Sequence, residues 1–203
     1  MARKKETRVL ELGDRFNAQV EYRGEGEEKH PVVIGYGAVF FDPADQGTEF
    51  PLWDDYVERI ARGAFDPVMA QDVRALFNHD PNMIVGRNTK EASSLVLALD
   101  ERGLRYEITP PDTQAGRDLI TNVKSKHVTG SSFSFTVAKG GTAITQEGDR
   151  TIRTITKLAR LWDVGPVTFP AYEGTEAETR AEDPSMAEAL KDVDAFRAES
   201  DPE

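Results

Sequence analysis

The sequence contains no cysteine among its 203 residues, and no apolar run long enough to span a bilayer. The first absence excludes disulfide bonds, thiolate catalysis and cysteine-ligated zinc. The second excludes a transmembrane helix, which needs about 20 consecutive apolar residues. The basic N-terminus is followed by no apolar stretch, so we predict no secretory signal, no membrane partner and a cytoplasmic location in the producing cell.

Histidine is almost as scarce, because only His30, His79 and His127 occur. Their spacing fits no metal-binding motif, so we predict neither a metal nor a cofactor. The sequence also lacks a glycine-rich phosphate loop and a G-x-S-x-G nucleophile elbow. These two absences count against a nucleotide-binding enzyme and against an esterase of the α/β-hydrolase type.

Basic residues form no stripe along the chain, although the acidic residues are strongly clustered. The formal net charge is -11, and residues 173–203 hold eleven acidic residues against three basic ones. The remainder of the chain is therefore nearly balanced. Without a basic surface to neutralise phosphates, nucleic acid is not an expected partner.

Short apolar or alternating runs, separated by turn residues, dominate the body of the chain. This pattern predicts a β-rich α+β fold, a barrel or sandwich with a few helices packed outside. We expect the folded domain to cover residues 9–172. Residues 1–8 are polar and are expected to be flexible. Residues 173–203 are expected to be a disordered acidic tail with at most one weak amphipathic helix.

Several elements are specific enough to be placed in the sequence. Residues 94–111 predict a hairpin around the turn "DERG", and residues 113–126 predict a helix with Thr113 as its N-cap. "DPVMAQ" indicates the start of a further helix, with Asp66 as N-cap. "VRALFNHD" predicts a strand in which Ala75, Phe77 and His79 share one face.

The strand "GSSFSFTV" raises the question of function, because hydroxyl and apolar residues alternate along it. Alternation places Ser132 and Ser134 on one face and the rings of Phe133 and Phe135 on the other. An ordinary strand serine and a nucleophile held in place by buried rings both fit this pattern.

Two further residues carry suitable chemistry, although each has a plainer interpretation. His79 ends an apolar strand, where a hydrogen-bonded core histidine is the commoner case. Asp163 shares parity with Leu161 and would face the interior, where a partnered structural aspartate is the commoner case. Together the serine, the histidine and the acid are what nucleophilic acyl transfer requires. Sequence alone does not show that they meet.

Six segments, in order from about Gly35 to Tyr172, resemble the prohead (capsid maturation) protease family of HK97-type phages. The segments that carry the resemblance are "GYGAVF", "VERIARGAF", "LFNHDPNMIVGR", "LALDERGLRYEI", "VTGSSFSF" and "LWDVGPVTFPAY". Each segment alone is a weak signal, whereas the ordered set is strong. The resemblance implies a serine endopeptidase with a β-barrel fold related to herpesvirus assemblins.

Carried over by position, the resemblance makes Ser132 the nucleophile, His79 the general base and Asp163 the third catalytic residue. The sequence departs from the family pattern at three positions. Ser134 stands where the family often has Gly, Asp163 replaces the usual Glu, and Gly165 replaces the usual Ser. His127 is the alternative third member, because assemblins use a second histidine in that role.

The resemblance also implies substrates and a place of action. We expect cleavage of scaffold and of the scaffolding segment of the major capsid protein, and of the protease itself, within the assembling procapsid in the host cytoplasm. The alternative is a catalytically silent assembly protein that keeps the fold and binds coat protein. A hydrolase of small esters is a third option, disfavoured by the missing elbow. The oligomeric state stays open, with a homo-oligomer as one option.

Overall fold

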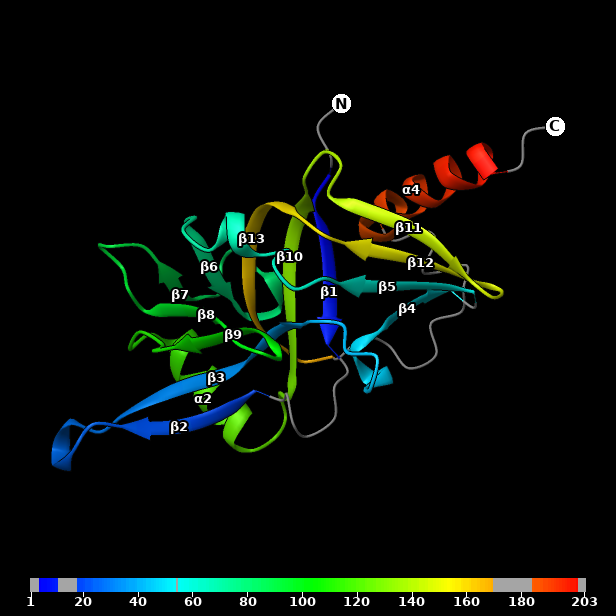
Figure 1. Ribbon diagram of the computed structural model, residues 1–203. Coiled ribbons are helices and arrows are strands. Elements are labelled where there is room, and N and C mark those ends of the chain that lie inside the picture. The colour runs from blue at the N-terminus through cyan, green and yellow to red at the C-terminus, as the bar shows by residue number, and fades with distance from the viewer. Residues whose placement is uncertain (1–3, 11–17, 54, 170–183, 201–203) are drawn as a thin grey trace.

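The computed structural model describes residues 4–10, 18–53, 55–169 and 184–200, and its strands form three sheets (Figure 1). The five-stranded sheet consists, in spatial order, of β1 (Glu6–Leu10), β10 (Gly130–Val137), β13 (Leu158–Val167), β6 (Val73–Leu76) and β7 (Ile84–Asn88). One four-stranded sheet consists of β11 (Thr142–Glu147), β12 (Arg150–Ile155), β5 (Tyr56–Ile60) and β4 (Phe50–Trp53). The other consists of β2 (Gln19–Arg23), β3 (His30–Val39), β9 (Gly103–Ile108) and β8 (Leu95–Leu99).

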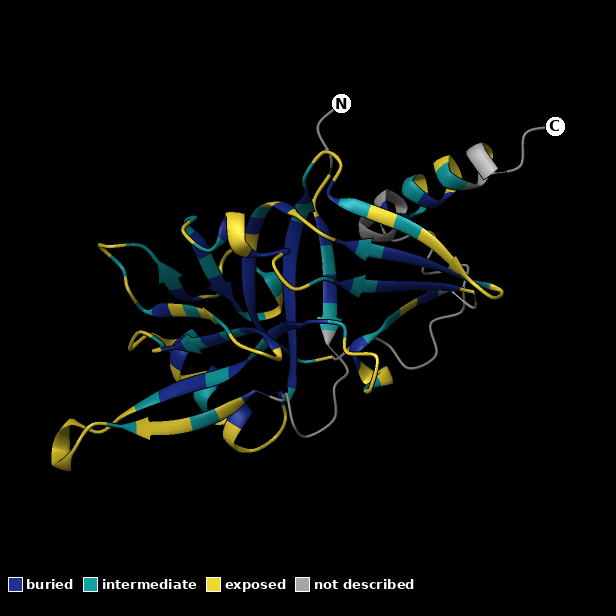
Figure 2. Ribbon diagram, viewed as in Figure 1, coloured by how far each residue is buried: buried dark blue, intermediate teal, exposed yellow. Residues whose placement is uncertain are grey.

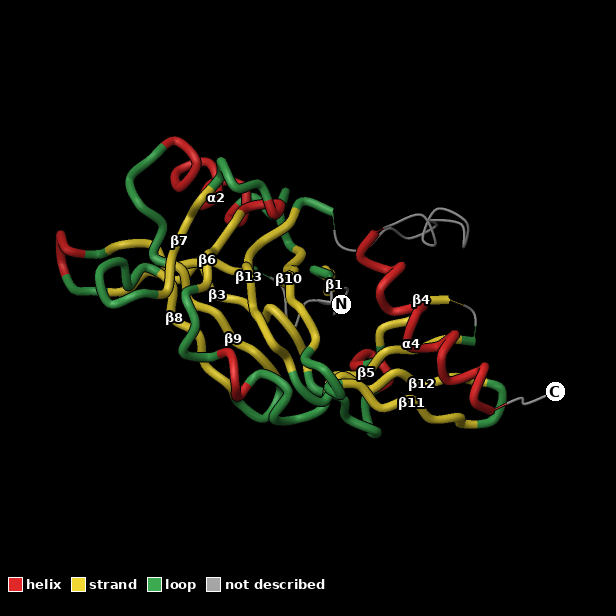
Figure 3. Tube along the Cα trace, turned by 90° about the horizontal axis from the view of Figure 1, so that it is seen from above, coloured by secondary structure: helices red, strands yellow, loops and turns green. Residues whose placement is uncertain are grey.

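Within the described residues, two α-helices and four single turns of 3-10 helix accompany the sheets. They are η1 (Gly26–Glu28), η2 (Gln46–Thr48), η3 (Asp66–Val68), η4 (Phe77–His79), α2 (Gln114–Lys124) and α4 (Pro184–Ser200). Figure 3 shows α4 beside β4, β5, β11 and β12 on one side of β10, and β3, β8 and β9 on the other side. None of the described helices is long and apolar enough to cross a membrane.

The core lies around β10 and β13, which are buried along most of their length (Figure 2). The rings of Phe133 and Phe135 stack with their centroids 4.8 Å apart, and Phe65 packs on Phe133 at 5.7 Å. Both phenylalanines of β10 are fully buried. Burial of these rings fixes which face of β10 is turned inward, and therefore where its serines point.

Two of the expected elements are confirmed. β8 and β9 pair as the antiparallel hairpin, and the Asp100 carboxylate accepts hydrogen bonds from the backbone N–H groups of the turn. Helix α2 begins after Thr113, whose side chain accepts a hydrogen bond from the backbone N–H of Gly116. Local turn and cap chemistry decides both elements, so that a single sequence suffices to find them.

Three expectations about the body of the chain need correction. The helix expected from Asp66 is only the single turn η3. The strand expected over "VRALFNHD" ends at Leu76, and the following η4 turns the chain so that His79 does not continue the strand face. The pairings among the described strands give three sheets and close no barrel, so the barrel expectation is not confirmed.

Both chain ends contribute more structure than their composition indicates. The flexible segment expected at residues 1–8 overlaps β1, in which Glu6 and Arg8 are buried. Within the tail that was expected to be disordered, α4 buries Ala189 and Val193 against Leu52 of β4 and Tyr56 of β5. Helix α4 corresponds to the one weak amphipathic helix that the sequence allowed in this tail. Residues 170–183, where the tail was expected to begin, lie outside the described residues.

Candidate functional site

His79 is positioned by an unusual backbone turn at the end of β6. Asn78 and His79 both have left-handed backbone conformations, with φ of 55° and 58°. Non-glycine residues rarely adopt this conformation, and those that do are concentrated at functional sites. The Asn78 side chain donates to Thr168 Oγ1 at 2.9 Å and accepts from the Thr168 backbone N–H at 2.8 Å. These two bonds fasten η4 to the end of β13.

A glycine lets this turn approach β13 closely. A Cβ atom at Gly165 would lie 2.6 Å from the carbonyl oxygen of Leu76, the residue immediately before η4. No side chain fits there unless the backbone moves.

Ser132 lies on β10, on the face opposite Phe133 and Phe135, and is 0% exposed. Its Oγ lies 2.5 Å from Nε2 of His79. Its hydroxyl is also placed to donate to the backbone carbonyl oxygen of Arg8, at 2.8 Å. The buried rings therefore anchor a strand whose opposite face presents Ser132 to an imidazole.

A bulge in β13 turns Asp163 toward the same site. In the pairing of β10 with β13, Ser134 lies opposite Asp163 and Phe135 lies opposite Leu161, so Trp162 is the extra residue. Residues that lie opposite each other share a face, and a bulge re-aims the side chains that follow it. Asp163 therefore faces the serines whereas Leu161 faces the core, and the expectation that both share a face is wrong.

Asp163 is buried and has two cationic or hydrogen-bonding partners. Its Oδ1 forms a close hydrogen bond with Nδ1 of His79, and its Oδ2 accepts from Lys5 Nζ at 3.0 Å. Burial acts to raise the pKa of Asp163, but the hydrogen bond from His79 and the charge of Lys5 outweigh it and lower that pKa. The carboxylate is therefore held in its charged form.

The three candidate residues thus meet in one chain of contacts, from Asp163 through His79 to Ser132. When Nδ1–H donates to the carboxylate, Nε2 is left as an acceptor for the serine proton. A carboxylate that fixes the tautomer of a histidine beside a serine is the arrangement that generates a serine nucleophile.

Two contacts to this group were missed by sequence reasoning. Ser134 Oγ lies 3.1 Å from His79 Nδ1 and 3.0 Å from Thr7 Oγ1. The parity that Ser134 shares with Ser132 was the available signal for its contact. No sequence signal pointed to the contact of Lys5 with Asp163, because the segment before residue 9 reads as a polar tail.

The structure does not bring the other histidine candidate to the site. His127 is exposed, and its Nδ1 lies 3.2 Å from Ser125 Oγ. No hydrogen bond or ion pair between described residues joins His127 to His79, Ser132 or Asp163. The described residues also include no group of three acidic or histidine side chains arranged to hold a metal ion.

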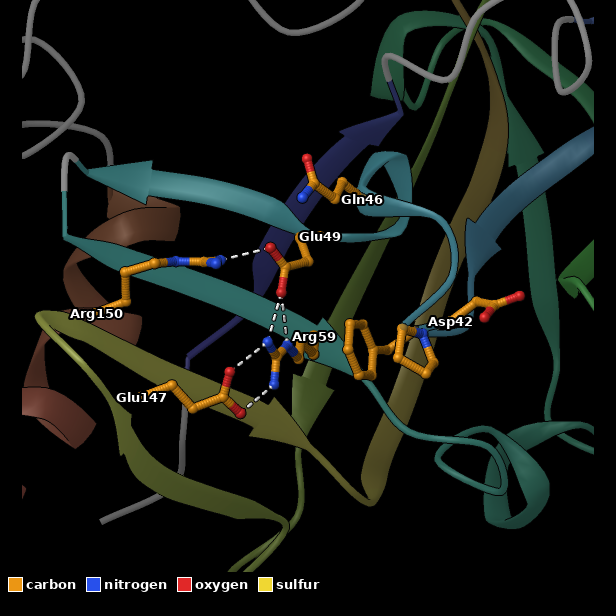
Figure 4. A pocket seen from close by; sticks show the side chains of 8 residues that line it. Asp42, Gln46, Glu49, Arg59, Glu147 and Arg150 are labelled. Carbon is orange, nitrogen blue, oxygen red and sulfur yellow. Dashed lines mark hydrogen bonds and ion pairs between the residues drawn. The ribbon is translucent and has the colours of Figure 1, made fainter.

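A pocket of about 350 Å³ lies away from these residues, between the segment 41–49, β5 and the turn of the β11–β12 hairpin (Figure 4). Arg59 lines it, with its guanidinium carbon 4.0 Å from the centroid of the Phe41 ring. The same guanidinium forms ion pairs with Glu49 and Glu147. Arg150 also pairs with Glu49. These charged side chains are paired with one another, and no lining residue is a serine, threonine or cysteine that could act as a nucleophile. The group around Ser132 is therefore the better candidate active site.

Comparisons with known proteins relate this chain to a protein family. The family model described as Caudovirus prohead serine protease matches residues 17–191. Among solved structures, the capsid assembly protease of bacteriophage T4 is similar, with a TM-score of 0.43 and 10% sequence identity, covering 82% of this chain and 99% of that one. A search of curated proteins found no match. All three candidate residues lie within the range that matches the family model.

Proposed function

Since the chain belongs to the Caudovirus prohead serine protease family, we propose that Ser132, His79 and Asp163 are the catalytic residues with which it matures a phage capsid. A capsid-maturation serine protease is the activity that the family establishes. The residue roles and the individual substrates are the proposed part.

The proposed mechanism uses the contacts around His79. Nε2 of His79 takes the proton of Ser132 as Oγ attacks the carbonyl carbon of the scissile peptide bond. Asp163 keeps the proton on Nδ1 and stabilises the imidazolium that forms. The amine then leaves with the proton from His79, and an acyl group remains on Ser132. Water removes this group with the same histidine acting as base. The observation that carries the proposal is the contact of Ser132 Oγ with His79 Nε2 at 2.5 Å.

The substrates we propose are scaffold and the scaffolding segment of the major capsid protein, cut inside the procapsid in the infected host cell. The protease itself is a further substrate of the same kind. Support comes from the family description, which names the prohead as the setting of the activity. A peptide segment has to reach Ser132 in an extended form, because the serine lies within a strand.

The test is the cleavage of coat protein by the purified protein and by two serine variants. Ser132→Ala abolishes cleavage and preserves the fold, because the removed hydroxyl makes no apolar packing. Ser134→Ala lies on the same face and serves as the matched control. It loses a neutral hydrogen bond, which stabilises by about 1 kcal/mol, so its rate falls by no more than about tenfold.

Two outcomes would contradict the proposal. If Ser134→Ala were inactive and Ser132→Ala active, the nucleophile would be the other serine. If wild type and Ser132→Ala both failed to cut coat protein but bound it equally, the silent assembly protein would be the better description.

A further inference from the structure

The N-terminal strand β1 contacts every member of the candidate site that lies on β10 or β13. It pairs antiparallel with β10, with Val9 opposite Ser132. The Arg8 carbonyl oxygen accepts from Ser132, Thr7 Oγ1 contacts Ser134, and Lys5 Nζ donates to Asp163. A strand that served the fold alone would not need to contact the reacting groups themselves.

These contacts oppose catalysis in two ways. The single hydroxyl proton of Ser132 has two acceptors within reach, His79 Nε2 at 2.5 Å and the Arg8 carbonyl oxygen at 2.8 Å. A proton donated to Arg8 is not available to the base. The serine is also 0% exposed, so an incoming peptide meets β1 before it meets Oγ.

Because β1 lies at the edge of its sheet, it can leave without breaking the pairing of the other strands. It is the edge strand of the five-stranded sheet and pairs only with β10 among the described strands. Departure of an edge strand leaves the remaining pairings intact and uncovers the edge of β10. An exposed edge is the surface to which an extended peptide adds by main-chain hydrogen bonds. β1 also precedes residues 17–191, the range that matches the family model.

Buried charges anchor β1. The Arg8 guanidinium donates to both carboxylate oxygens of Glu58 on β5, at 2.6 and 2.9 Å. Glu6 accepts from both terminal nitrogens of Arg153 on β12, at 2.9 and 3.1 Å. All four side chains are almost fully buried. Removing one partner of such a network leaves an uncompensated buried charge, which strongly destabilises the bound state.

From this arrangement, and resting on the proposed function, we propose that β1 is an intramolecular inhibitor that occupies the peptide-binding edge of β10. The four charges of Glu6, Arg8, Glu58 and Arg153 hold it in place. Cleavage by the full chain is slow because only the molecules whose β1 has left can react, and an extended peptide segment takes the same edge once β1 leaves.

The experiment measures how fast Ser132 reacts with diisopropyl fluorophosphate, which phosphorylates active serines with loss of fluoride. Five chains are compared: the full chain, a chain lacking residues 2–10, Arg8→Gln, Arg102→Gln, and Ser132→Ala as the blank. Arg102→Gln is the matched control, because Arg102 is an exposed arginine in the β8–β9 turn. Circular dichroism and thermal unfolding report whether each chain is folded.

We expect the truncated chain and Arg8→Gln to be labelled about 10- to 1,000-fold faster than the full chain and Arg102→Gln. This range corresponds to an open state populated at roughly 0.1–10% while β1 is present. The heptapeptide of residues 4–10, "KKETRVL", added to the truncated chain slows labelling again. The same peptide with Glu6→Ala and Arg8→Ala does not.

Each other outcome overturns the inference. Equal labelling of all folded chains that retain Ser132 shows that β1 does not restrict the serine, and leaves the proposed function in place. A truncated chain that fails to fold makes β1 an integral strand. If no chain is labelled at all, Ser132 is not a nucleophile, and the proposed function falls together with this inference.

Discussion

Substitution of Gly165 tests whether the close approach of two backbones sets the distance from His79 to Ser132. In Gly165→Ala, the new Cβ lies 2.6 Å from the Leu76 carbonyl oxygen, whereas ordinary contact begins at 3.4 Å. The two backbones must therefore separate by about 0.8 Å, because neither contact atom belongs to a flexible side chain. Leu76 immediately precedes η4, so the turn that carries His79 moves with it.

The expected effects on stability and activity follow from this displacement. Overpacking of this kind costs about 1–3 kcal/mol of unfolding free energy. For a chain of this size each kcal/mol lowers Tm by about 2–4 °C, giving a decrease of roughly 2–12 °C. A displacement approaching 1 Å at a catalytic base costs up to about 100-fold in kcat. KM should change little, because the edge of β10 is untouched.

The assay compares thermal unfolding and coat-protein cleavage in Gly165→Ala and in a matched variant, Ala159→Ser. Ala159 lies on the same strand but is exposed, so an added atom there meets solvent. The control should behave as wild type. A Gly165→Ala protein with Tm within 1 °C and kcat within twofold of the control would refute the reasoning.

Two further predictions concern the acid and the C-terminal helix. Asp163→Asn should lower kcat by about 10³- to 10⁴-fold, as loss of a tautomer-fixing carboxylate does, and His127→Ala should leave it within about twofold. The reverse result would transfer the third role to His127. Because the folded-state pKa of Asp163 is lowered, its charge stabilises the fold above about pH 4, and this stabilisation is lost as pH falls through the depressed value. The difference in unfolding free energy between wild type and Asp163→Asn, measured with urea, should therefore narrow as pH falls below 4. A widening difference would contradict the lowered pKa of Asp163. A chain ending at Thr175 loses the apolar contacts of α4, and its Tm should fall by about 5 °C or more while the domain stays folded. An unchanged Tm in calorimetry would mean that α4 does not stabilise the domain.

The sequence predicted the serine best, because its orientation depends on a local pattern. Alternation along β10 is uninterrupted from Ser132 to Phe135, and burial of the rings decides the faces. The same reasoning failed for Asp163, since a single extra residue, Trp162, reverses the parity of β13. A bulge is a property of the pairing of two strands, and the sequence of one strand does not reveal it.

The sequence predictions for His79 and for the segment that forms β1 differ from the structure for two separate reasons. Asn and His adopt left-handed conformations more often than most other non-glycine residues, but the alternating pattern of residues 73–79 favoured a strand through His79. The composition of β1 is polar because its buried partners are charged as well. A prediction that assigns only apolar residues to buried strands does not identify such a strand.

Arg153 joins the two ends of the polypeptide, because its guanidinium binds Glu6 of β1 and also Asp192 of α4. A single cation thus takes part in the docking of two segments that lie almost the whole sequence apart. Docking equilibria that share a partner are thermodynamically linked, and the coupling free energy is the same in both directions. Docking of α4 therefore changes the affinity for β1 by the same factor as docking of β1 changes the affinity for α4. Release of α4 at the C-terminus would in this way alter the occupancy of β1 beside Ser132, without any change in Ser132, His79 or Asp163.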